Sequence, residues 1–567
     1  MAKSYDDDGV KMEERPTGLS SNSPSLFISS ARLEAALEQV ERELMAARTP
    51  AGYWTGELSS SALSTATAVI ALAVVARETP GGSNGEKGTG DAERKTDLLA
   101  VARAGLKWLA EQANADGGWG DTTRSLSNIS TTALCWAAFG AVPGADAQYR
   151  ATVLHAEKWL ADYIHIPHAA LCTPHSALIR AIIQRYGKDR TFSVPILTAC
   201  ALAGRFGSGP EAWRWVLPLP FELAACPHQC FAILRLPVVS YALPALIAMG
   251  QARHVHRPSR NPLVRLVRHL TRQRTLRVLT SIQPGSGGFL EATPLTSFVV
   301  MSLAGSGQAL HPVTRRGIAF LRQSQRPDGS WAIDTNLATW VTTLAVNALA
   351  QGAEASGSQG AHDARQRAMV RWLLDQQYRA EHPYTHAAPG GWAWTDLPGG
   401  VPDADDTAGA VLALFQARNA ECRVQNGKAE GVRESEFLAA ASAGIHWLLE
   451  LQNRDGGIPT FCRGWGALPF DRSSADLTAH ALRAWLAWLE ELAPALQQRV
   501  NQAFARGLRF LEATQRADGA WVPLWFGNQF APEDENPTYG TARVVLALAE
   551  ARERFPAAGK LLSRGAG

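Results

Sequence analysis

Apolar, helix-like segments alternate with short polar turns along most of this chain, and the alternation repeats. One unit consists of a helix that ends in Leu and Gln, a turn of the type Asp-Gly-Gly, an aromatic residue, a loop and a second helix that begins near a Thr. Clear copies of the turn and its last residue span 116–119, 328–331, 390–392, 455–458 and 518–521, and weaker copies span 52–54 and 287–289. The pattern predicts an all-α chain of helix pairs.

Each part of the turn has a physical task. The glycine can adopt the positive φ that ends a helix. The aromatic ring behind it can pack on the start of a helix, and the Gln can bond backbone groups that are exposed there. Helix pairs in regular succession predict an α-toroid in which inner and outer helices alternate, and a plain helical solenoid is the alternative.

Length and composition set the scale of the molecule. A chain of 567 residues is expected to form two domains, and 46% apolar with 19% charged residues suits a packed core. The net charge of +3 gives no sign of nucleic-acid binding. The seven cysteines form no Cys-X-X-Cys pair, so we predict reduced thiols and neither a metal site nor a cofactor.

The beginning of the chain does not have the pattern of a signal peptide. Residues 1–24 are polar and acidic, and no apolar run follows a basic start, so this segment is predicted to be a disordered tail. No window reaches the roughly 18 uninterrupted apolar residues that a membrane-spanning helix requires.

Two unusual segments interrupt the repeats. Residues 213–250 are apolar and contain five prolines, which is too many for a spanning helix. Residues 251–280 contain eight arginines and no acidic residue. An apolar plateau beside a basic rim is typical of a protein that lies in one leaflet of an anionic membrane. The alternative is a buried connector followed by a solvated helix face.

The strongest chemical signal is the segment Pro402-Asp-Ala-Asp-Asp-Thr407, which puts Asp403, Asp405 and Asp406 in the cap and first turn of a predicted helix. A helix N-terminus favours ionised carboxylates, whereas crowding of like charges in an apolar cavity holds a proton on one of them. In a dry cavity one Asp would stay protonated and act as a general acid. The alternative is an acidic helix cap without a catalytic role.

A second pair lies further along the chain. Asp476 and His480 are four residues apart, so they share one helix face, and the carboxylate can orient and charge the imidazole. A charged imidazolium that faces the Asp cluster would bond one oxygen of the acid. Such a pair is otherwise a surface pair, so the prediction requires the two helices to meet.

Aromatic residues are dense in the loops of this half of the chain. Ring faces carry negative potential and can stabilise carbocations without acting as nucleophiles. Packing within the repeat turns is the alternative, and it suits Trp392 and Trp521 best. The other aromatic residues of these loops are Trp394, Phe461, Trp465, Trp525, Phe526 and Tyr539.

These features together resemble the squalene–hopene cyclase family, the bacterial branch of the class II terpene cyclases. The Gly-aromatic turns resemble its Gln-Trp repeats. Residues 402–407 match its Asp-X-Asp-Asp-Thr acid motif, and residues 476–480 match its Asp-X-Thr-Ala-His segment. The similarity covers about residues 50 to 550.

The resemblance implies two α/α barrels, which we assign to residues 25–284 and 285–567, a central cavity and a monotopic attachment through residues 213–280 to the cytoplasmic face of a membrane. It implies that Asp405 is the proton donor, with Asp403 and Asp406 beside it, and that His480 is its hydrogen-bond partner with Asp476 behind. The residues that fall where the family has cavity aromatics, and that would bind substrate, are Trp394, Phe461, Trp525 and Tyr539.

The chain departs from the family pattern in three places. Thr293-Pro-Leu295 stands where the family has Pro-Pro-Trp, and Trp340-Val-Thr342 where it has Trp-Asp-Thr. The last residues, 562–567, are similar to the start of another repeat, and about 100 residues with the final repeats are missing relative to the family. We therefore expect the second barrel to be incomplete at its C-terminal end, open on one side, and weakly active or inactive.

The resulting functional hypothesis is a terpene cyclase, an isomerase that protonates a terminal alkene of squalene or a related linear polyprene and starts hopanoid-type cyclisation. A class II diterpene cyclase acting on a prenyl diphosphate and an inactive truncated homologue are the alternatives. The His480 segment favours the first, because the diphosphate enzymes usually lack it. The expected partners are a linear isoprenoid and a membrane surface, with no nucleic acid, and the sequence leaves a homodimer open.

Overall fold

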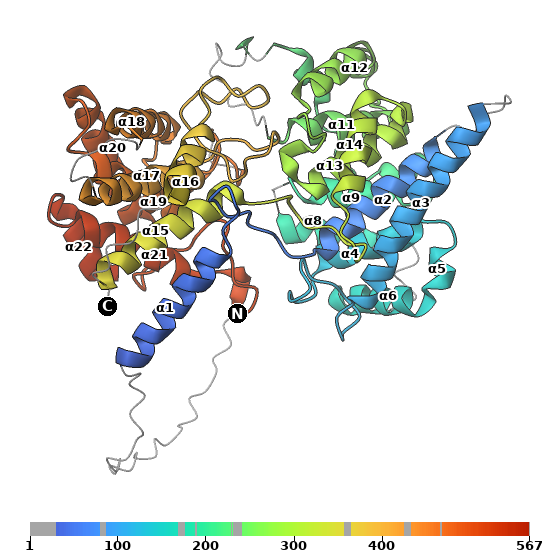
Figure 1. The fold of residues 1–567 in the computed structure, drawn as a ribbon. Helices are drawn as coiled ribbons and strands as arrows, with labels where there is room; N and C mark the ends of the chain where they lie inside the picture. Colours follow the sequence, from blue (N-terminus) through green and yellow to red (C-terminus); the bar gives the residue numbers. More distant parts are fainter. Residues whose placement is uncertain are drawn as a thin grey trace, which may run out of the picture. The chain divides into compact units, whose positions relative to one another are not determined.

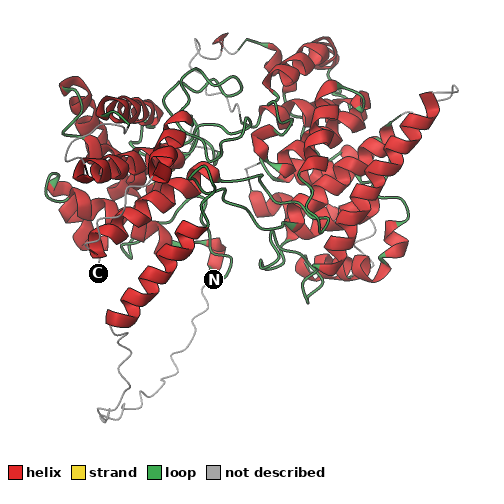
Figure 2. Ribbon diagram, in the orientation of Figure 1, coloured by secondary structure: helices red, strands yellow, loops and turns green. Residues whose placement is uncertain are grey.

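The chain folds almost entirely into α-helices (Figures 1 and 2). The computed structural model describes residues 30–79, 87–167, 176–187, 190–227, 229–230, 241–356, 364–424, 432–464 and 468–565. The predicted disordered tail, residues 1–24, lies outside them. Residues 1–47 form one unit, of which helix α1 (Ser30–Ala46) is described, and residues 48–567 form a second. The all-α prediction is confirmed.

The first half of the larger unit is a closed ring of helix pairs. The five inner helices pack in succession, and α13 packs back on α2. The inner helices are α2 (Ala62–Glu78), α4 (Ile129–Ala141), α9 (Ser193–Leu202), α11 (Leu243–His256) and α13 (Thr293–Leu303). The outer helices are α3 (Lys87–Glu111), α6 (Arg150–Tyr163), α8 (Ser176–Tyr186), α12 (Pro262–Ile282) and α14 (Pro312–Gln323).

Burial explains which helices are inner. All ten residues of α9 are buried, whereas the outer helix α14 buries one face only. A helix that is surrounded by other helices is apolar all round, and a helix with one solvated side is amphipathic. Short elements join the pairs: α5 (Ala145–Gln148), η1 (Pro210–Trp213), η2 (Phe221–Ala225), η3 (Phe289–Glu291) and the π-helical turn η4 (Ala304–Gln308).

The second half is an arc of helix pairs. Its inner helices pack in the order α15 (Ala338–Ser356), α17 (Ala404–Val424), α19 (Ala475–Trp488) and α21 (Pro537–Ala551). Its outer helices are α16 (Ala364–Asp375), α18 (Glu434–Leu451), α20 (Pro494–Thr514) and α22 (Pro556–Gly565), with η5 (Pro532–Asp534) before α21. The strands β1 (Ile458–Pro459) and β2 (Ser473–Ser474) pair antiparallel. Among the described residues, α21 and α15 do not pack on each other as the other neighbouring inner helices do.

One hydrogen bond recurs in both halves and anchors an inner helix to a Gly-aromatic turn. The hydroxyl of a Thr in the first turns of the helix accepts the backbone N–H of the residue that ends the Gly-aromatic turn. The Thr407 hydroxyl accepts from Trp392, that of Thr478 from Ile458, and that of Thr541 from Trp521, at 2.9–3.0 Å. The first Gly of each of these turns has a positive φ, 116° at Gly390, as the sequence predicts.

The same bond closes the first ring and marks where it ends. Trp331 follows α14, yet its N–H donates to Thr65 at the start of α2, 3.0 Å away. The turn at Trp54 precedes α2, but its backbone N–H donates to the hydroxyl of Thr342 and so anchors α15. The sequence placed the boundary between the two barrels at residue 284. Helices α13 and α14 lie beyond it, yet they pack in the first ring, because the turn after α14 bonds the first inner helix.

The Gln that precedes each turn links consecutive outer helices. Gln452 donates from Nε2 to the carbonyl of Gly456 in its own turn at 2.8 Å and to the carbonyl of Ala503 in α20 at 2.9 Å. Gln377 makes the equivalent pair of bonds to Gly390 and Ala440. Each amide thus donates once to a turn carbonyl and once to a carbonyl of the next outer helix, which ties the turn to that helix.

Replacing Gln452 by Ala should lower the thermal unfolding midpoint. The substitution removes the Gln452 donor from the buried turn carbonyl of Gly456 and the bond to α20, and an unsatisfied buried group costs about 1–3 kcal/mol. The measurement is a melt followed by circular dichroism. Gln498→Ala, at an exposed position of α20, is the control and should leave the midpoint unchanged. Equal midpoints for the two variants would contradict the proposed link.

Candidate active site

The three carboxylates of the acid motif lie at the start of α17, where its first turn meets two neighbouring segments. Asp405 and Asp406 are in the first turn. Asp403 precedes it, and its Oδ1 accepts the backbone N–H of Asp406 at 2.9 Å, in the manner of a helix cap. The N–H of Asp403 donates to the carbonyl of Trp392 at 3.0 Å, and the N–H of Ala404 to that of Thr460 at 2.8 Å. The motif is thereby fixed to both loops.

Helices α17 and α19 meet at this point, as the sequence requires for a site. Nδ1 of His480 lies 2.5 Å from Oδ1 of Asp405. The side chain of His480 is 6% exposed and that of Asp405 17%. Asp403 and Asp406 are each 4% exposed, and one oxygen of each, Oδ2 of Asp403 and Oδ1 of Asp406, is buried without a hydrogen-bond partner. Asp405 is thus the most accessible of the three carboxyl groups.

The three carboxyl groups differ in acidity. Burial raises the pKa of Asp403 to about 7, with a further contribution from the charge of Asp405. Burial, together with the charges of Asp403 and Asp405, raises the pKa of Asp406 well above its usual value. Burial also acts to raise the pKa of Asp405, but the hydrogen bond and charge of His480 and the charge of Arg543 outweigh it and lower the pKa. Asp403 and Asp406 therefore retain a proton to higher pH than Asp405 does.

His480 is subject to opposing electrostatic influences. Burial and the charge of Arg543 lower its pKa, whereas the hydrogen bond to Asp405 and the charge of Asp405 act in the opposite direction. The imidazole stabilises the Asp405 carboxylate by donating its Nδ1–H. Asp476 accepts its hydrogen bond from the Ser474 hydroxyl and not, among the described residues, from His480. Burial raises the pKa of Asp476.

Asp405 has a further partner, Arg543, which the sequence did not predict. Nη2 of Arg543 on α21 lies 3.6 Å from Oδ1 of Asp405, and its side chain is 23% exposed. Its guanidinium also lies over the ring of Tyr539, 5.9 Å from the ring centroid. Tyr539 packs on Phe526 with ring centroids 4.7 Å apart. Of the four aromatic residues predicted to bind substrate, Tyr539 is therefore on the α21 side of the acid.

The other three predicted aromatics belong to one cluster. Phe461 packs edge-on against Trp394, with ring centroids 6.2 Å apart. Phe470 connects Phe461 to Trp525, at 6.2 and 6.5 Å. The indole N–H of Trp525 donates to the Thr460 hydroxyl at 2.7 Å. Because Thr460 also bonds the acid motif through Ala404, this cluster is tied to the start of α17.

Two members of the cluster could not be predicted from the repeats. Tyr241 comes from the first half of the chain, and its ring lies 4.4 Å from Phe461. Phe470 lies in the loop before β2. Asp334 accepts the indole N–H of Trp394 at 3.0 Å, and burial raises its pKa to about 8. Trp465 lies outside the described residues.

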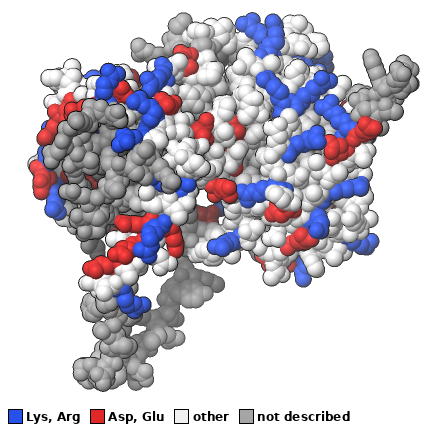
Figure 3. Space-filling view, viewed as in Figure 1, with Lys and Arg blue, Asp and Glu red and all other residues white. Residues whose placement is uncertain are grey.

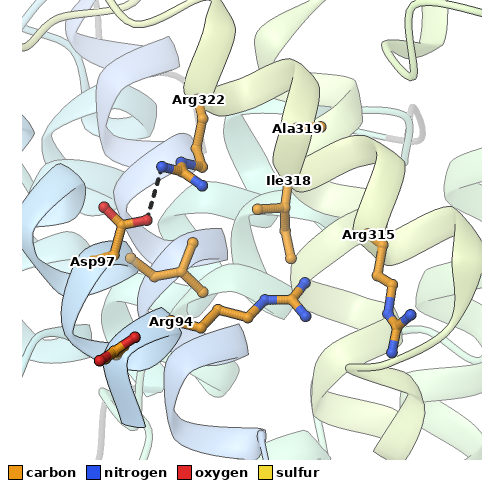
Figure 4. Close-up of a pocket in the computed structure, with 8 residues that line it drawn as sticks. Arg94, Asp97, Arg315, Ile318, Ala319 and Arg322 are labelled. Atoms are coloured by element: carbon orange, nitrogen blue, oxygen red, sulfur yellow. Dashed lines mark ion pairs between the residues drawn. The ribbon is translucent and has the colours of Figure 1, made fainter. Parts of the chain in front are cut away.

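A groove of about 440 Å³ lies away from this site, between the outer helices α3 and α14 of the first ring (Figure 4). Asp97 and Arg322 form an ion pair there at 2.8 Å, and Arg94 and Arg315 line the same groove. In the part of the chain that the structure describes, no cluster of three His, Cys, Asp or Glu residues could hold a metal ion.

The sequence of this chain is similar to a known domain family and to several known proteins. Residues 336–562 match the model of the squalene-hopene cyclase C-terminal domain. The squalene–hopene cyclase of Alicyclobacillus acidocaldarius is 27% identical over 48% of this chain and 42% of that protein. Enfumafungin synthase of Hormonema carpetanum is 28% identical over 42% of this chain and 18% of that protein. The matched segments thus span less than half of the length of these relatives.

Among solved structures, ent-copalyl diphosphate synthase from Streptomyces platensis aligns over 93% of this chain and 82% of its own, at 17% identity and a TM-score of 0.47. Sporulenol synthase of Bacillus subtilis is a further sequence relative, 25% identical over 41% of this chain and 35% of that protein.

Asp406→Asn should raise the thermal unfolding midpoint, and the gain should be larger at pH 8 than at pH 5. A carboxyl whose pKa is higher in the folded than in the unfolded state destabilises the fold as the pH rises above the unfolded value, because only the unfolded chain then ionises freely. The amide removes this penalty. Asp375→Asn, at an exposed position of α16, is the control. A lower midpoint for Asp406→Asn at pH 8 would contradict the assigned direction.

Proposed function

Because this chain belongs to the class II terpene cyclase family, we propose that it starts the cyclisation of a linear polyprene by protonating a terminal carbon–carbon double bond. The observation that carries the proposal is the buried acid cluster, in which Asp405 is the accessible carboxyl group and is bonded by His480, with aromatic faces beside it. We propose squalene or a related triterpene precursor as the substrate.

Asp405 suits the role of proton donor by position. Its Oδ1 is engaged by His480, so the proton is transferred from Oδ2 in the protonated form of Asp405, which is the minor form at neutral pH because the pKa of this carboxyl is lowered. In the step, the O–H bond breaks, a C–H bond forms at the CH carbon of the terminal double bond and a tertiary cation remains on the neighbouring carbon, which bears the two methyl groups. The resulting carboxylate is stabilised by the Nδ1–H of His480 and by Arg543. Asp403 and Asp406 beside it have raised pKa values and so retain a proton to higher pH than Asp405 does.

The aromatic cluster suits the second half of the chemistry. Trp394, Phe461 and Trp525 offer π faces that attract a cation and provide no nucleophilic atom to trap it. The carboxylate of Asp334, where it is ionised, would enrich the indole of Trp394 in electron density through the N–H bond. A class II diterpene cyclase acting on a prenyl diphosphate is the second candidate, since the same acid chemistry would serve it, and an inactive homologue is the third.

Attachment to a membrane is part of the proposal, and the described residues favour α12 as the attachment surface. Within residues 213–250, Trp213, Phe221 and Tyr241 are buried, whereas Trp215, Leu217 and Leu223 are 39–51% exposed. Residues 228 and 231–240 lie outside the described part. On α12, four large apolar side chains at spacings of three and four are 47–71% exposed: Leu263, Leu266, Val267 and Leu270.

The charge of α12 fits an anionic lipid surface. The helix contains five arginines and no acidic residue, and basic side chains gather over this part of the molecule in Figure 3. An exposed apolar stripe flanked by Arg binds at the headgroup boundary of one leaflet. No described helix is long and apolar enough to cross a membrane. We propose that α12 lies on the cytoplasmic leaflet, where a water-insoluble polyprene would be taken up.

Asp405→Asn should abolish cyclisation, with a loss of about 10²-fold or more, because an amide cannot protonate an alkene. The purified chain is incubated in detergent with squalene and, separately, with geranylgeranyl diphosphate, and products are identified by gas chromatography and mass spectrometry. Asp375→Asn serves as the control that retains activity. Normal turnover by Asp405→Asn, with a melting curve like that of the parent, would show that another group donates the proton.

Leu266→Glu combined with Leu270→Glu should strongly reduce flotation with vesicles that contain anionic phospholipid. Two carboxylates on the exposed stripe oppose both apolar insertion and attraction to the anionic surface. Leu154→Glu on α6, where the leucine is 41% exposed, is the matched control and should float as the parent does. Unchanged flotation of the double variant would exclude α12 as the attachment surface.

A further inference from the structure

Arg543 occupies the position in the last described repeat that His480 occupies in the one before it. Each inner helix is anchored by the Thr that bonds the preceding turn, Thr478 in α19 and Thr541 in α21. Both His480 and Arg543 follow their anchoring Thr by two residues, and Gly409 follows Thr407 by two in α17. Since the anchors fix the rotation of each helix on its turn, residues at this position are directed toward the neighbouring inner helix of the arc.

The geometry at Asp405 agrees with this equivalence. His480 and Arg543 approach the same oxygen, Oδ1, at 2.5 and 3.6 Å. Helices α17, α19 and α21 pack in succession, so the acid receives one cationic or polar partner from each of the next two helices (Figure 1). The guanidinium is held over the ring of Tyr539, one turn earlier on α21.

We propose that Arg543 is a positioning residue of the acid motif: together with His480 it occupies Oδ1 of Asp405, directs the transferable proton to Oδ2, and shifts the working range of the acid to lower pH. The proposal rests on the proposed function, since it assigns a role in the proton transfer. It concerns a residue outside the acid motif and outside the His segment.

The direction of the effect follows from electrostatics. A guanidinium at this distance stabilises the carboxylate more than the carboxylic acid, so fewer Asp405 side chains are protonated at a given pH, while each protonated one is a stronger acid. Rate increases less than proportionally with acid strength, so above the pKa the loss of protonated molecules dominates. Arg543 therefore lowers activity at neutral pH, while it stabilises the carboxylate that remains after proton transfer.

Other charged and titratable groups face Asp405 from the surrounding elements. Asp403 lies directly before α17 and Asp406 in its first turn, His480 and Asp476 lie on α19, and Tyr539 lies beside Arg543 on α21. The carboxyl groups of Asp403, Asp406 and Asp476 favour a proton on Asp405, whereas His480 and Arg543 oppose it. Of these groups, Arg543 alone stays charged across the whole pH range of an assay.

The test compares the pH dependence of squalene turnover in Arg543→Met, Arg543→Lys and the parent. In Arg543→Met the decline of activity on the basic side should move upward by about one to three pH units, so the variant is faster than the parent above that decline. Arg543→Lys retains the charge and should move it much less. Arg552→Met, an exposed position directly after α21, removes the same charge elsewhere and should give the parent profile.

Two results would overturn the proposal: an Arg543→Met profile that superimposes on that of the parent, and a uniform loss at every pH without a shift, which is what a merely structural arginine would give. A second measurement does not need turnover. Infrared difference titration follows the carbonyl stretch of the protonated Asp405, identified by its loss in Asp405→Asn. Its midpoint should rise in Arg543→Met. If the parent cyclises nothing, the proposed function fails, and the infrared midpoint alone decides whether Arg543 acts on Asp405.

Discussion

The bond between an inner-helix Thr and the preceding Gly-aromatic turn is the constraint on which the remaining structure depends. A helix packed in a ring could rotate about its axis or slide along it, because apolar packing is non-directional. A buried hydroxyl that accepts one particular backbone N–H removes both freedoms. Each turn is in turn fixed to its outer helix, as when the Trp392 indole donates to the carbonyl of Leu373 at 2.8 Å. The first residues of successive inner helices are therefore held in fixed relative positions.

This constraint is what makes an unfavourable cluster of carboxylates tolerable. Asp403, Asp405 and Asp406 would repel one another and lose hydration on burial. The fold places these neighbouring carboxyl groups in two different environments. Asp405 is placed against His480 and Arg543, which lower its pKa, while Asp403 and Asp406 have an unpartnered oxygen each and raised pKa values. Neighbouring groups of the same chemical type thus acquire opposite tendencies from their surroundings, which is the arrangement that proton transfer requires.

The aromatic cluster shows how the two halves of the chain cooperate. Trp394, Phe461 and Trp525 come from three loops of the second half, and Tyr241 is supplied by the first half. The hydroxyl of Tyr241 donates to the carbonyl of Phe461 at 3.2 Å, and the hydroxyl of Tyr384 donates to the carbonyl of Tyr241 at 2.6 Å. A site built in this way depends on the junction between the rings, where Trp331 returns to α2 and Trp54 seats α15.

The sequence by itself determined the all-α fold, the turns and the motif that carries the acid, because glycine conformation, helix capping and repeat spacing act over a few residues. It also contained a signal for Arg543, since this residue follows Thr541 as His480 follows Thr478. Tertiary structure alone decided the rest: that α13 and α14 belong to the first ring, that Arg543 reaches Asp405, and that the pKa of Asp405 is lowered while those of Asp403 and Asp406 are raised. Burial and charge at a given atom are sums over groups that are distant in sequence, and only the packed helices bring those groups together.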